Sequence, residues 1–353
     1  MSTTPALLRH RFRNQRLTGP GFATPADVVA WLGAVQSQDY LGAKWSVGQR
    51  VVKGTDALVE DAFNRGTILR THLLRPTWHF VAPADIRWML ELSAPRIHRL
   101  NAYWYRTNGV DHAVVARAGR AVEKALQGGN SCTREEVQEL LARAGITAEK
   151  MRLAGIMMHL ELDQLVVSGP MRGKRHTYAL LDERAPAATP IGRDEALARL
   201  AHRFFTGHGP ATVRHLAWWS SLSLRDSSAG LAAARDRLDG DTIDGVEWFG
   251  LAGAAPRSPV RGAHFIPEYD EALVGLRELG LTDLPRSRRK WTDTFLRPVL
   301  IDGCRAGTWR RHLGPEVRLE TNLFTRLDPA QAAKLERAAA RYGRFLGQPV
   351  TLA

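Results

Sequence analysis

A β-hairpin is predicted by residues 67–81, which read TILRTHLLRPTWHFV. Both halves are rich in β-branched and aromatic residues, and Arg75-Pro76 separates them where a turn is expected. Helical patterns precede and follow the hairpin, and one of them starts at Thr24-Pro25 with a capping side chain and a first-turn proline. The predicted helices are Ala6–Leu17, Thr24–Ala34, Asp56–Asn64 and Pro83–Arg99. Three helices followed by a hairpin are the order of elements in a winged-helix unit.

The same order of helices and hairpin recurs twice further along the chain. In the second round, Thr133 and Glu136 form a capping box, and the strands QLVVSG and TYAL flank the basic stretch PMRGKRH. In the third round, helices lead into a strand pair near TIDGVEWFGLA. The predicted helices are 111–126, 133–144 and 148–162 in the second round, and 193–205, 212–219 and 223–238 in the third.

The fold class predicted from this order is α+β, with tandem winged-helix units followed by a small C-terminal β-barrel-like domain and a terminal helix. Past the third round, turns rich in Gly and Pro separate short strand-like runs, which are VEWFGLAG, AHFIP, FLRPVLIDG, GTWRRHL and EVRLETNLF. The terminal helix, Asp328–Phe345, starts with Pro329 after an aspartate cap, and RAPAATP (184–190) is the linker candidate. The predicted units are 1–110, 111–185, 191–250 and 251–353.

The chain is strongly basic. Its 353 residues include 49 Lys plus Arg against 36 Asp plus Glu, a net charge of +13, and 42 of the cations are Arg. Two segments concentrate this charge: residues 1–110 hold 14 basic and 7 acidic side chains, and residues 286–318 hold 9 and 3. Clustered cations predict a polyanionic partner, and we expect this partner to be damaged duplex DNA. Solvated surface faces are the alternative explanation of such runs.

Composition excludes several other classes of protein. The hydrophobic share of 44% and the charged share of 24% are those of a globular protein. No apolar run reaches the roughly 18–20 residues of a membrane span, and the N-terminal residues lack the apolar stretch of a signal peptide. Cys132 and Cys304 form neither a disulfide framework nor a paired metal site. We expect a cytoplasmic, nucleoid-associated monomer without a membrane partner.

Common catalytic and cofactor motifs are missing from the sequence. It contains no GxxxxGK[ST] loop, no HExxH, no EF-hand loop and no GxSxG elbow. The 12 histidines show no metal-ligand spacing, so we expect neither a metal nor a cofactor. The cluster Glu268-Tyr269-Asp270-Glu271 could hold a divalent ion, although a structural role at a strand-to-helix corner is favoured.

Two glutamines, Gln36 and Gln38, are the candidate catalytic residues. They begin the run QSQDYLGAKW (36–45), where the second predicted helix should end. If the backbone there is extended, residues i and i+2 project to the same side, so both amides share one face. A Gln amide donates and accepts hydrogen bonds but is no strong base, so the pair is suited to orienting a water molecule. Helix capping or loop hydrogen bonding is the alternative.

The chain resembles the bacterial winged-helix DNA glycosylases, the AlkZ/YcaQ-like family. The resemblance rests on QSQDYLGAKW, ILRTHLLRPTWHFV, APADIRWMLELSAPRI, PEYDEALVGL and the terminal GRFLGQPVTL, so it covers nearly the whole chain. It implies tandem winged helices with a C-terminal β domain, forming a basic concave surface for duplex DNA. The implied activity is hydrolysis of the N-glycosidic bond of alkylated purines, including crosslinked ones. In the family motif two Gln flank a hydrophobic residue; Gln36 and Gln38 match, with Ser37 at the centre.

The resemblance implies a monofunctional glycosylase acting on purines alkylated at N7 or N3. Such a purine is positively charged and leaves as a neutral base, so the enzyme mainly has to aim a water molecule at C1′. Lys44 is the only lysine close to the motif, so a Schiff-base step is not expected. The side chains expected to contact DNA are Arg9, Arg11, Arg13, Arg16, Lys44, Arg70, His72, Arg75, His79, Arg286, Arg288, Arg289 and Lys290.

Two other functions stay open at this point. One is a transcription regulator that reads an operator, although regulators usually dimerise and no heptad seam is present. The other is a non-catalytic protein that sequesters a DNA-reactive small molecule, with Trp248, Phe249 and Trp291 as candidate lining residues. Replacing Gln36 and Gln38 separates these cases, because only an enzyme loses activity while it keeps DNA binding.

Overall fold

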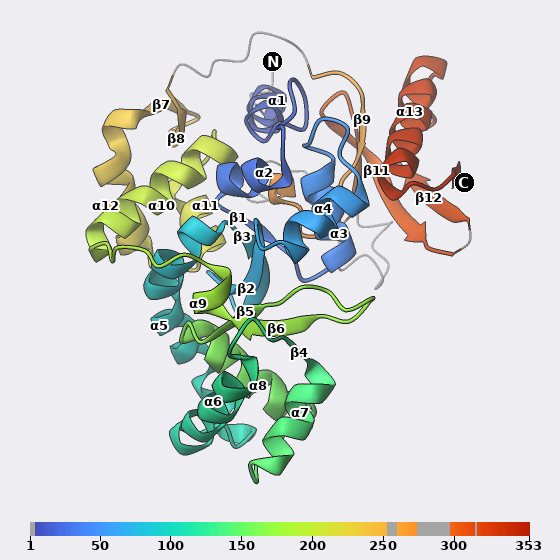
Figure 1. Cartoon of the computed structure of the whole chain (residues 1–353). Coiled ribbons are helices and arrows are strands. Elements are labelled where there is room, and N and C mark those ends of the chain that lie inside the picture. Colours follow the sequence, from blue (N-terminus) through green and yellow to red (C-terminus); the bar gives the residue numbers. More distant parts are fainter. Residues whose placement is uncertain (1–3, 253–259, 274–296, 315) are drawn as a thin grey trace.

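The computed structural model describes residues 4–252, 260–273, 297–314 and 316–353, which form a mixed α+β structure (Figure 1). The predicted α+β class is therefore confirmed, and most helices lie within a few residues of their expected positions. In these residue ranges, none of the helices has the length and apolar character needed to cross a bilayer.

The first region is built around a three-stranded antiparallel sheet with the order β1-β3-β2. In this sheet Gln36 lies opposite His79. Thr24 and Asp27 form a reciprocal capping box, which starts the second helix where the sequence predicts it. The elements are α1 (Thr4–Asn14), α2 (Pro25–Leu32), β1 (Ala34–Gln36), α3 (Tyr40–Gly48), α4 (Asp56–Asn64), β2 (Leu69–Leu73), β3 (Thr77–Val81) and α5 (Pro83–Thr107).

Helix α3 is absent from the sequence prediction. Its first turn is capped by Asp39, whose Oδ1 accepts a hydrogen bond from the Gly42 N–H at 3.1 Å. Residues 42–48 are all buried, so the helix has no polar face and no amphipathic period that would reveal it. The chain therefore enters a helix directly after the Gln36–Gln38 motif instead of continuing as a loop.

The second region repeats the strand order of the first. Its three-stranded sheet has the order β4-β6-β5, and Thr133 and Glu136 form the predicted capping box. Figure 1 shows its β5–β6 hairpin as a long green arm above the helices of this region. The elements are α6 (His112–Leu126), β4 (Cys132–Thr133), α7 (Arg134–Arg143), α8 (Lys150–Leu162), β5 (Val166–Ser168), β6 (Thr177–Leu180) and α9 (Leu181–Arg184).

The third region consists of helices and a two-stranded hairpin. Trp248 and Phe249 of this hairpin are 8% and 4% exposed and belong to hydrophobic cores, so they do not line a small-molecule pocket, and Trp291 lies outside the described residues. The elements are α10 (Arg193–His208), α11 (Val213–Ser220), α12 (Leu224–Ala234), η1 (Arg235–Arg237), β7 (Leu238–Ile243) and β8 (Val246–Leu251).

The C-terminal region holds a five-stranded sheet with the order β13-β12-β11-β10-β9, which is consistent with the predicted β-barrel-like domain. In the described residues β9 and β13 are its two edges, so this sheet is open. The run VEWFGLAG belongs to the β7–β8 hairpin instead, and β13 pairs in parallel with β12. The elements are β9 (Ala263–Phe265), η2 (Glu271–Leu273), β10 (Pro298–Ile301), β11 (Cys304–His312), β12 (Val317–Leu323), α13 (Pro329–Leu346) and β13 (Val350–Leu352).

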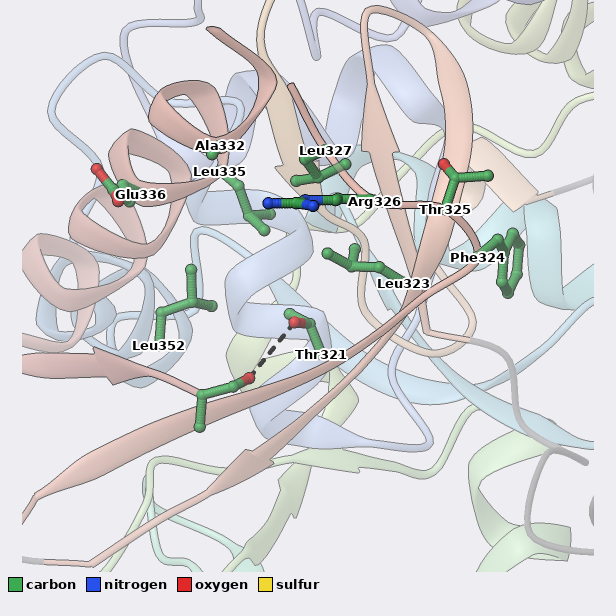
Figure 2. Close-up of a pocket in the computed structure, with 11 residues that line it drawn as sticks. Thr321, Leu323, Phe324, Thr325, Arg326, Leu327, Ala332, Leu335, Glu336 and Leu352 are labelled. Carbon is green, nitrogen blue, oxygen red and sulfur yellow. Dashed lines mark hydrogen bonds between the residues drawn. The ribbon is translucent and has the colours of Figure 1, made fainter. Parts of the chain in front are cut away.

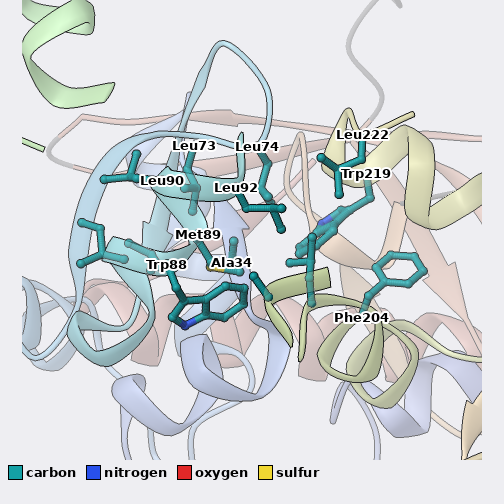
Figure 3. Packing of buried hydrophobic residues seen from close by; sticks show 14 of the residues in the cluster. Ala34, Leu73, Leu74, Trp88, Met89, Leu90, Leu92, Phe204, Trp219 and Leu222 are labelled. Carbon is teal, nitrogen blue, oxygen red and sulfur yellow. The ribbon is translucent and has the colours of Figure 1, made fainter. Parts of the chain in front are cut away.

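Two hydrophobic cores join regions that are distant in sequence. Trp45 of α3 packs on Tyr342 and Phe345 of α13, with ring centroids 4.9 and 5.0 Å apart. Figure 3 shows the other shared core, in which Trp88 from α5 lies in one cluster with Trp219 from α11. Because burial of such aromatic groups dominates core energetics, the first region is held against both the third and the C-terminal regions.

Candidate active site

Gln36 is the last residue of β1, and hydrogen bonds hold both its backbone and its side chain. Its N–H donates to Glu271 Oε1 at 2.8 Å, and its Oε1 accepts from Arg75 Nη2 at 2.8 Å. Because a guanidinium can only donate, the amide atom that faces Arg75 is the oxygen. The second lone pair of this oxygen and the Gln36 NH₂ group can bind further partners. The residue is half-buried and accessible to solvent.

Arg75 comes from the turn between β2 and β3 and links Gln36 to His79. Arg75 Nη2 lies 3.2 Å from His79 Nε2, while His79 Nδ1 lies 2.9 Å from the carbonyl oxygen of Thr77. Since that oxygen only accepts, Nδ1 carries the hydrogen and Nε2 accepts from Arg75. Burial, aided by the charge of Arg75, lowers the pKa of His79 well below its ordinary value. The imidazole is therefore neutral at pH 7.

An exposed aromatic ring lies beside Arg75. The Arg75 Cζ atom is 5.1 Å from the ring centroid of Trp218 on α11, and the indole is 61% exposed. Arg75 Nη1 is buried and has no hydrogen-bond partner in the part of the chain that the structure describes. The Gln36 amide is thus accompanied by an exposed aromatic surface and by a buried N–H donor without a partner in the described residues.

Glu271 holds the backbone of Gln36. Besides the Gln36 N–H, it accepts a hydrogen bond from Trp219 Nε1 on Oε2 at 2.8 Å. Burial raises the pKa of Glu271 to about 7, although the nearby charge of Arg75 acts in the other direction. Sequence reasoning missed its contact with Gln36, because 235 residues separate the two. The only signal was its membership of the acidic cluster 268–271.

The other acids of this cluster pair with arginines. Asp270 and Arg50 are both fully buried and form an ion pair at 2.7 Å. Burial alone would raise the pKa of Asp270, but the adjacent Arg50 holds it below its ordinary value. Glu268 pairs with Arg297 at 3.1 Å. Because these carboxylates already have guanidinium partners, the structure favours the structural role of the cluster over a divalent-ion site.

Ser37, at the centre of the motif, points into the protein. It is 0% exposed, and its N–H donates to the Trp78 carbonyl oxygen at 2.7 Å. Its own carbonyl and hydroxyl oxygens accept hydrogen bonds from Arg70 Nε, both at 3.3 Å. Arg70 thereby satisfies a polar residue at a position where the family motif has a hydrophobic one. Gln38 is exposed just beyond the strand, and whether its amide shares a face with that of Gln36 stays a prediction.

Five of the predicted DNA contacts lie inside the protein, and this corrects the expectation for them. Lys44 forms ion pairs with Asp56 and Glu60, both at 2.7 Å, and His72 pairs with Glu161. A buried and paired cation cannot reach a phosphate, so these side chains support the fold around the motif. Sequence reasoning missed this because their partners come from other elements. The five are Arg11, Lys44, Arg70, His72 and His79.

Apart from Arg75, the remaining predicted contacts fall into two groups. Arg9, Arg13 and Arg16 in and after α1 are half-buried, and the Arg16 guanidinium lies 5.6 and 5.4 Å from the ring centroids of Phe22 and Trp31. The second group lies outside the described residues: Arg286, Arg288, Arg289 and Lys290. Of the nine predicted contacts that lie in the described residues, Arg75 is the one that reaches the Gln36 amide.

A separate hollow lies between β12 and the start of α13 (Figure 2). Its lining is largely apolar, with Leu323, Leu335 and Leu352 among the residues that Figure 2 labels. It holds one acid, Glu336, and one guanidinium, Arg326, and neither is deeply buried. Since buried polar groups that converge on one point mark the Gln36 region instead, we place the candidate active site at Gln36.

Comparison with known proteins identifies the class of enzyme. The family described as DNA glycosylase AlkZ-like matches residues 29–345, a range that includes Gln36, Arg75 and Glu271. The chain belongs to the AlkZ-like DNA glycosylase family. The family and the class of enzyme predicted from the sequence are therefore confirmed.

Individual relatives agree with this assignment. The chain is 24% identical, over 316 residues and 85% of each chain, to an interstrand DNA cross-link repair glycosylase from Streptomyces sahachiroi. Among solved structures, it is similar to the Streptomyces sahachiroi DNA glycosylase AlkZ, with a TM-score of 0.79 and 22% identity across the full length of both chains. At this identity the structural likeness establishes the shared fold.

Proposed function

We propose that this protein hydrolyses the N-glycosidic bond of alkylated purines in duplex DNA, with a water molecule positioned by Gln36 and Gln38. The observation that carries the proposal is the double anchoring of Gln36, by Glu271 through its backbone and by Arg75 through its side chain. Catalysis by positioning needs a side chain that is held in one orientation. A glutamine that only caps a helix or hydrogen-bonds within a loop needs neither of these two anchoring contacts.

The reaction requires no strong acid or base from the protein. The C1′–N9 bond breaks with its electron pair going to the charged base, which leaves as a neutral alkylpurine. The water oxygen bonds to C1′, and its proton passes to solvent. Gln36 Oε1 accepts a hydrogen bond from this water with its second lone pair and so aims it at C1′. The neutral His79 stabilises the Arg75 contact and takes no proton.

Trp218 is the residue that we assign to the lesion. A glycosylase must take its target nucleotide out of the base stack. An exposed indole can stack on the extruded base or on the base pairs beside the gap that it leaves. Trp218 has this exposure, and the Arg75 guanidinium lies 5.1 Å from the centroid of its ring. The relative named for interstrand cross-link repair suggests that bulky or crosslinked N7 adducts are substrates here as well.

The duplex is held by its phosphates. We propose that the helix–helix–helix–hairpin regions act as tandem winged-helix units and that Arg9, Arg13, Arg16 and the cluster 286–290 contact the backbone. Contacts of this kind position DNA without reading sequence, which suits an enzyme that searches for lesions. Burial excludes five side chains of the original set from this role, namely Arg11, Lys44, Arg70, His72 and His79.

The experiment is a single-turnover assay on a labelled duplex with one N7-methylguanine, with abasic sites scored by mild alkaline cleavage. A second duplex carries an N7-linked interstrand crosslink. We expect base release by the wild type and a loss of about a hundredfold or more in Gln36→Ala/Gln38→Ala, with DNA affinity retained. The matched control is Gln127→Ala, an exposed glutamine in the second region, which keeps full activity.

The outcomes separate the alternatives. Release from the crosslinked duplex alone would assign the bulkier substrate. Release from neither duplex by a folded, DNA-binding wild type would overturn the proposed activity on N7-alkylpurines. Equal rates in the wild type and the double variant would overturn the role of the glutamines.

A further inference from the structure

Three side chains of metal-ligating type come together where α5 packs against α8. His98 lies on α5, His159 lies on α8, and Asp163 follows α8 as its C-cap. One ligand atom from each of them, an imidazole nitrogen or a carboxylate oxygen, lies within 4.8 Å of the other two. The sequence predicts no metal-ligand spacing here, because His98 stands 65 residues before Asp163 and only folding joins them.

Both imidazoles are directed at the same carboxylate. His98 Nε2 lies 3.2 Å from Asp163 Oδ1, and His159 Nδ1 lies 2.9 Å from Asp163 Oδ2. In a tetrahedral site with metal–ligand bonds of about 2.0–2.1 Å, the ligand atoms are about 3.3 Å apart. The two histidine–carboxylate distances are therefore close to the separation that an ion requires, and the ligand atoms of the two histidines lie within 4.8 Å of each other.

The surroundings of the three residues also match a metal site. The Tyr105 hydroxyl lies 3.4 Å from His98 Nδ1, and such a bond at the second ring nitrogen orients ligating histidines. The Asp163 side chain is 48% exposed, so an ion and its remaining water ligands can enter from solvent.

We propose that His98, His159 and Asp163 bind one Zn²⁺ ion. Two imidazole nitrogens and one carboxylate oxygen suit zinc, whereas Mg²⁺ and Ca²⁺ prefer oxygen ligands throughout. Zinc replaces the protons that now lie between the rings and the carboxylate and clamps α8 to α5, the long helix that follows the β2–β3 hairpin. The site shares no residue with the Gln36 site and does not rest on the proposed function.

The experiment titrates Zn²⁺ against a chromophoric chelator in the metal-stripped, tag-free full chain. Cys132→Ser and Cys304→Ser form the background, because both thiols are free and can also bind zinc. We expect one equivalent of Zn²⁺ per chain, no competition from millimolar Mg²⁺, and a rise of the melting temperature with zinc. His98→Ala, His159→Ala and the size-matched Asp163→Asn each weaken binding at least about tenfold and abolish that rise.

The matched control is His312→Ala. His312 is also ion-paired, with Glu320 at 3.0 Å, but lies on the C-terminal sheet, and its loss leaves zinc binding unchanged. Melting curves without zinc check that each variant is folded. The proposal is overturned if the background chain binds no stoichiometric Zn²⁺, or if it binds zinc equally well after His98→Ala and Asp163→Asn.

Discussion

The β2–β3 and β5–β6 hairpins have the same place in the same strand order. Their basic side chains differ in burial, because those of β2–β3 lie mostly inside the protein and those of β5–β6 lie in solvent. In β2–β3, Arg70 and His72 are buried, and Arg75 in the turn reaches the Gln36 amide. In β5–β6, Arg172, Lys174 and Arg175 at the tip are all exposed. Next to this tip the second hairpin contacts the first region, because the Met171 N–H donates to Asn64 Oδ1 at 2.7 Å.

The difference shows that basic residues in one topology can serve two purposes. The first hairpin uses its cations as hydrogen-bond donors that hold the Gln36–Gln38 motif, at the cost of removing them from solvent. The second hairpin keeps its cations in solvent, where a phosphate can reach them. A count of positive charge cannot separate these roles, and burial can.

The largest expected effect concerns the first hairpin. Arg75→Ala removes the donor to Gln36 Oε1, and we expect the single-turnover rate of base release at saturating DNA to fall about a hundredfold. Lys174→Ala at the exposed tip of the other hairpin is the matched control and keeps its rate. Equal rates for the two variants would mean that the hairpins do not differ in the way described.

The second prediction tests the pH dependence of the buried network. Glu271 has an ordinary pKa of 4.5 and a pKa of about 7 in the folded chain, so between these values the folded state holds a proton that the unfolded state has released. Stability therefore falls as the pH rises through this range. Relative to Glu271→Gln, we expect the wild type to lose on the order of 2 kcal/mol of unfolding free energy from pH 5 to 7. Unfolding free energies from chemical denaturation that change with pH in the same way in the wild type and in Glu271→Gln would contradict this prediction.

The third prediction concerns the exposed hairpin. Lys174→Ala/Arg175→Ala removes two exposed cations that we expect to contact phosphates, so DNA affinity should fall about tenfold and the slope of log K against log salt should lessen by about 2. Fluorescence anisotropy over a salt series measures both quantities. Arg120→Ala/Lys124→Ala, an exposed basic pair on α6, is the control and keeps the slope. A loss that is identical at every salt concentration would argue against phosphate contacts.

The smallest effect is expected at the motif centre. Ser37→Ala deletes a hydroxyl that accepts from the buried Arg70, so we expect a loss of about 1 kcal/mol of unfolding free energy. The exposed Ser228→Ala is the control, with almost no change. If both variants unfold at the same denaturant concentration, Arg70 does not depend on the Ser37 hydroxyl.

Local patterns in the sequence were enough to predict much of the fold. The run TILRTHLLRPTWHFV gives the first hairpin, and the capping residues Thr24 and Thr133 give two helix starts. Helix α3 escaped prediction because its residues 42–48 are all buried, and β13 because it pairs with a distant strand. These elements depend on packing between regions, which no local pattern contains.

The candidate site was only partly predictable, because it too depends on packing between regions. The glutamines and Arg75 stand in recognisable runs, but the contact of Glu271 with Gln36 depends on the C-terminal region meeting β1. The interior position of Lys44 likewise follows from Asp56 and Glu60 on α4, which lie 12 and 16 residues along the chain. Charge and spacing could suggest DNA contacts, whereas burial decides which side chains are available.

The central claim is that Arg75 acts by holding the Gln36 amide, and a double-mutant cycle tests it most directly. Single-turnover base release from the N7-methylguanine duplex is measured for wild type, Gln36→Ala, Arg75→Ala and the double variant. The account predicts that Arg75→Ala costs about a hundredfold in the wild type and almost nothing once Gln36 is alanine. Independent losses that multiply in the double variant would contradict it.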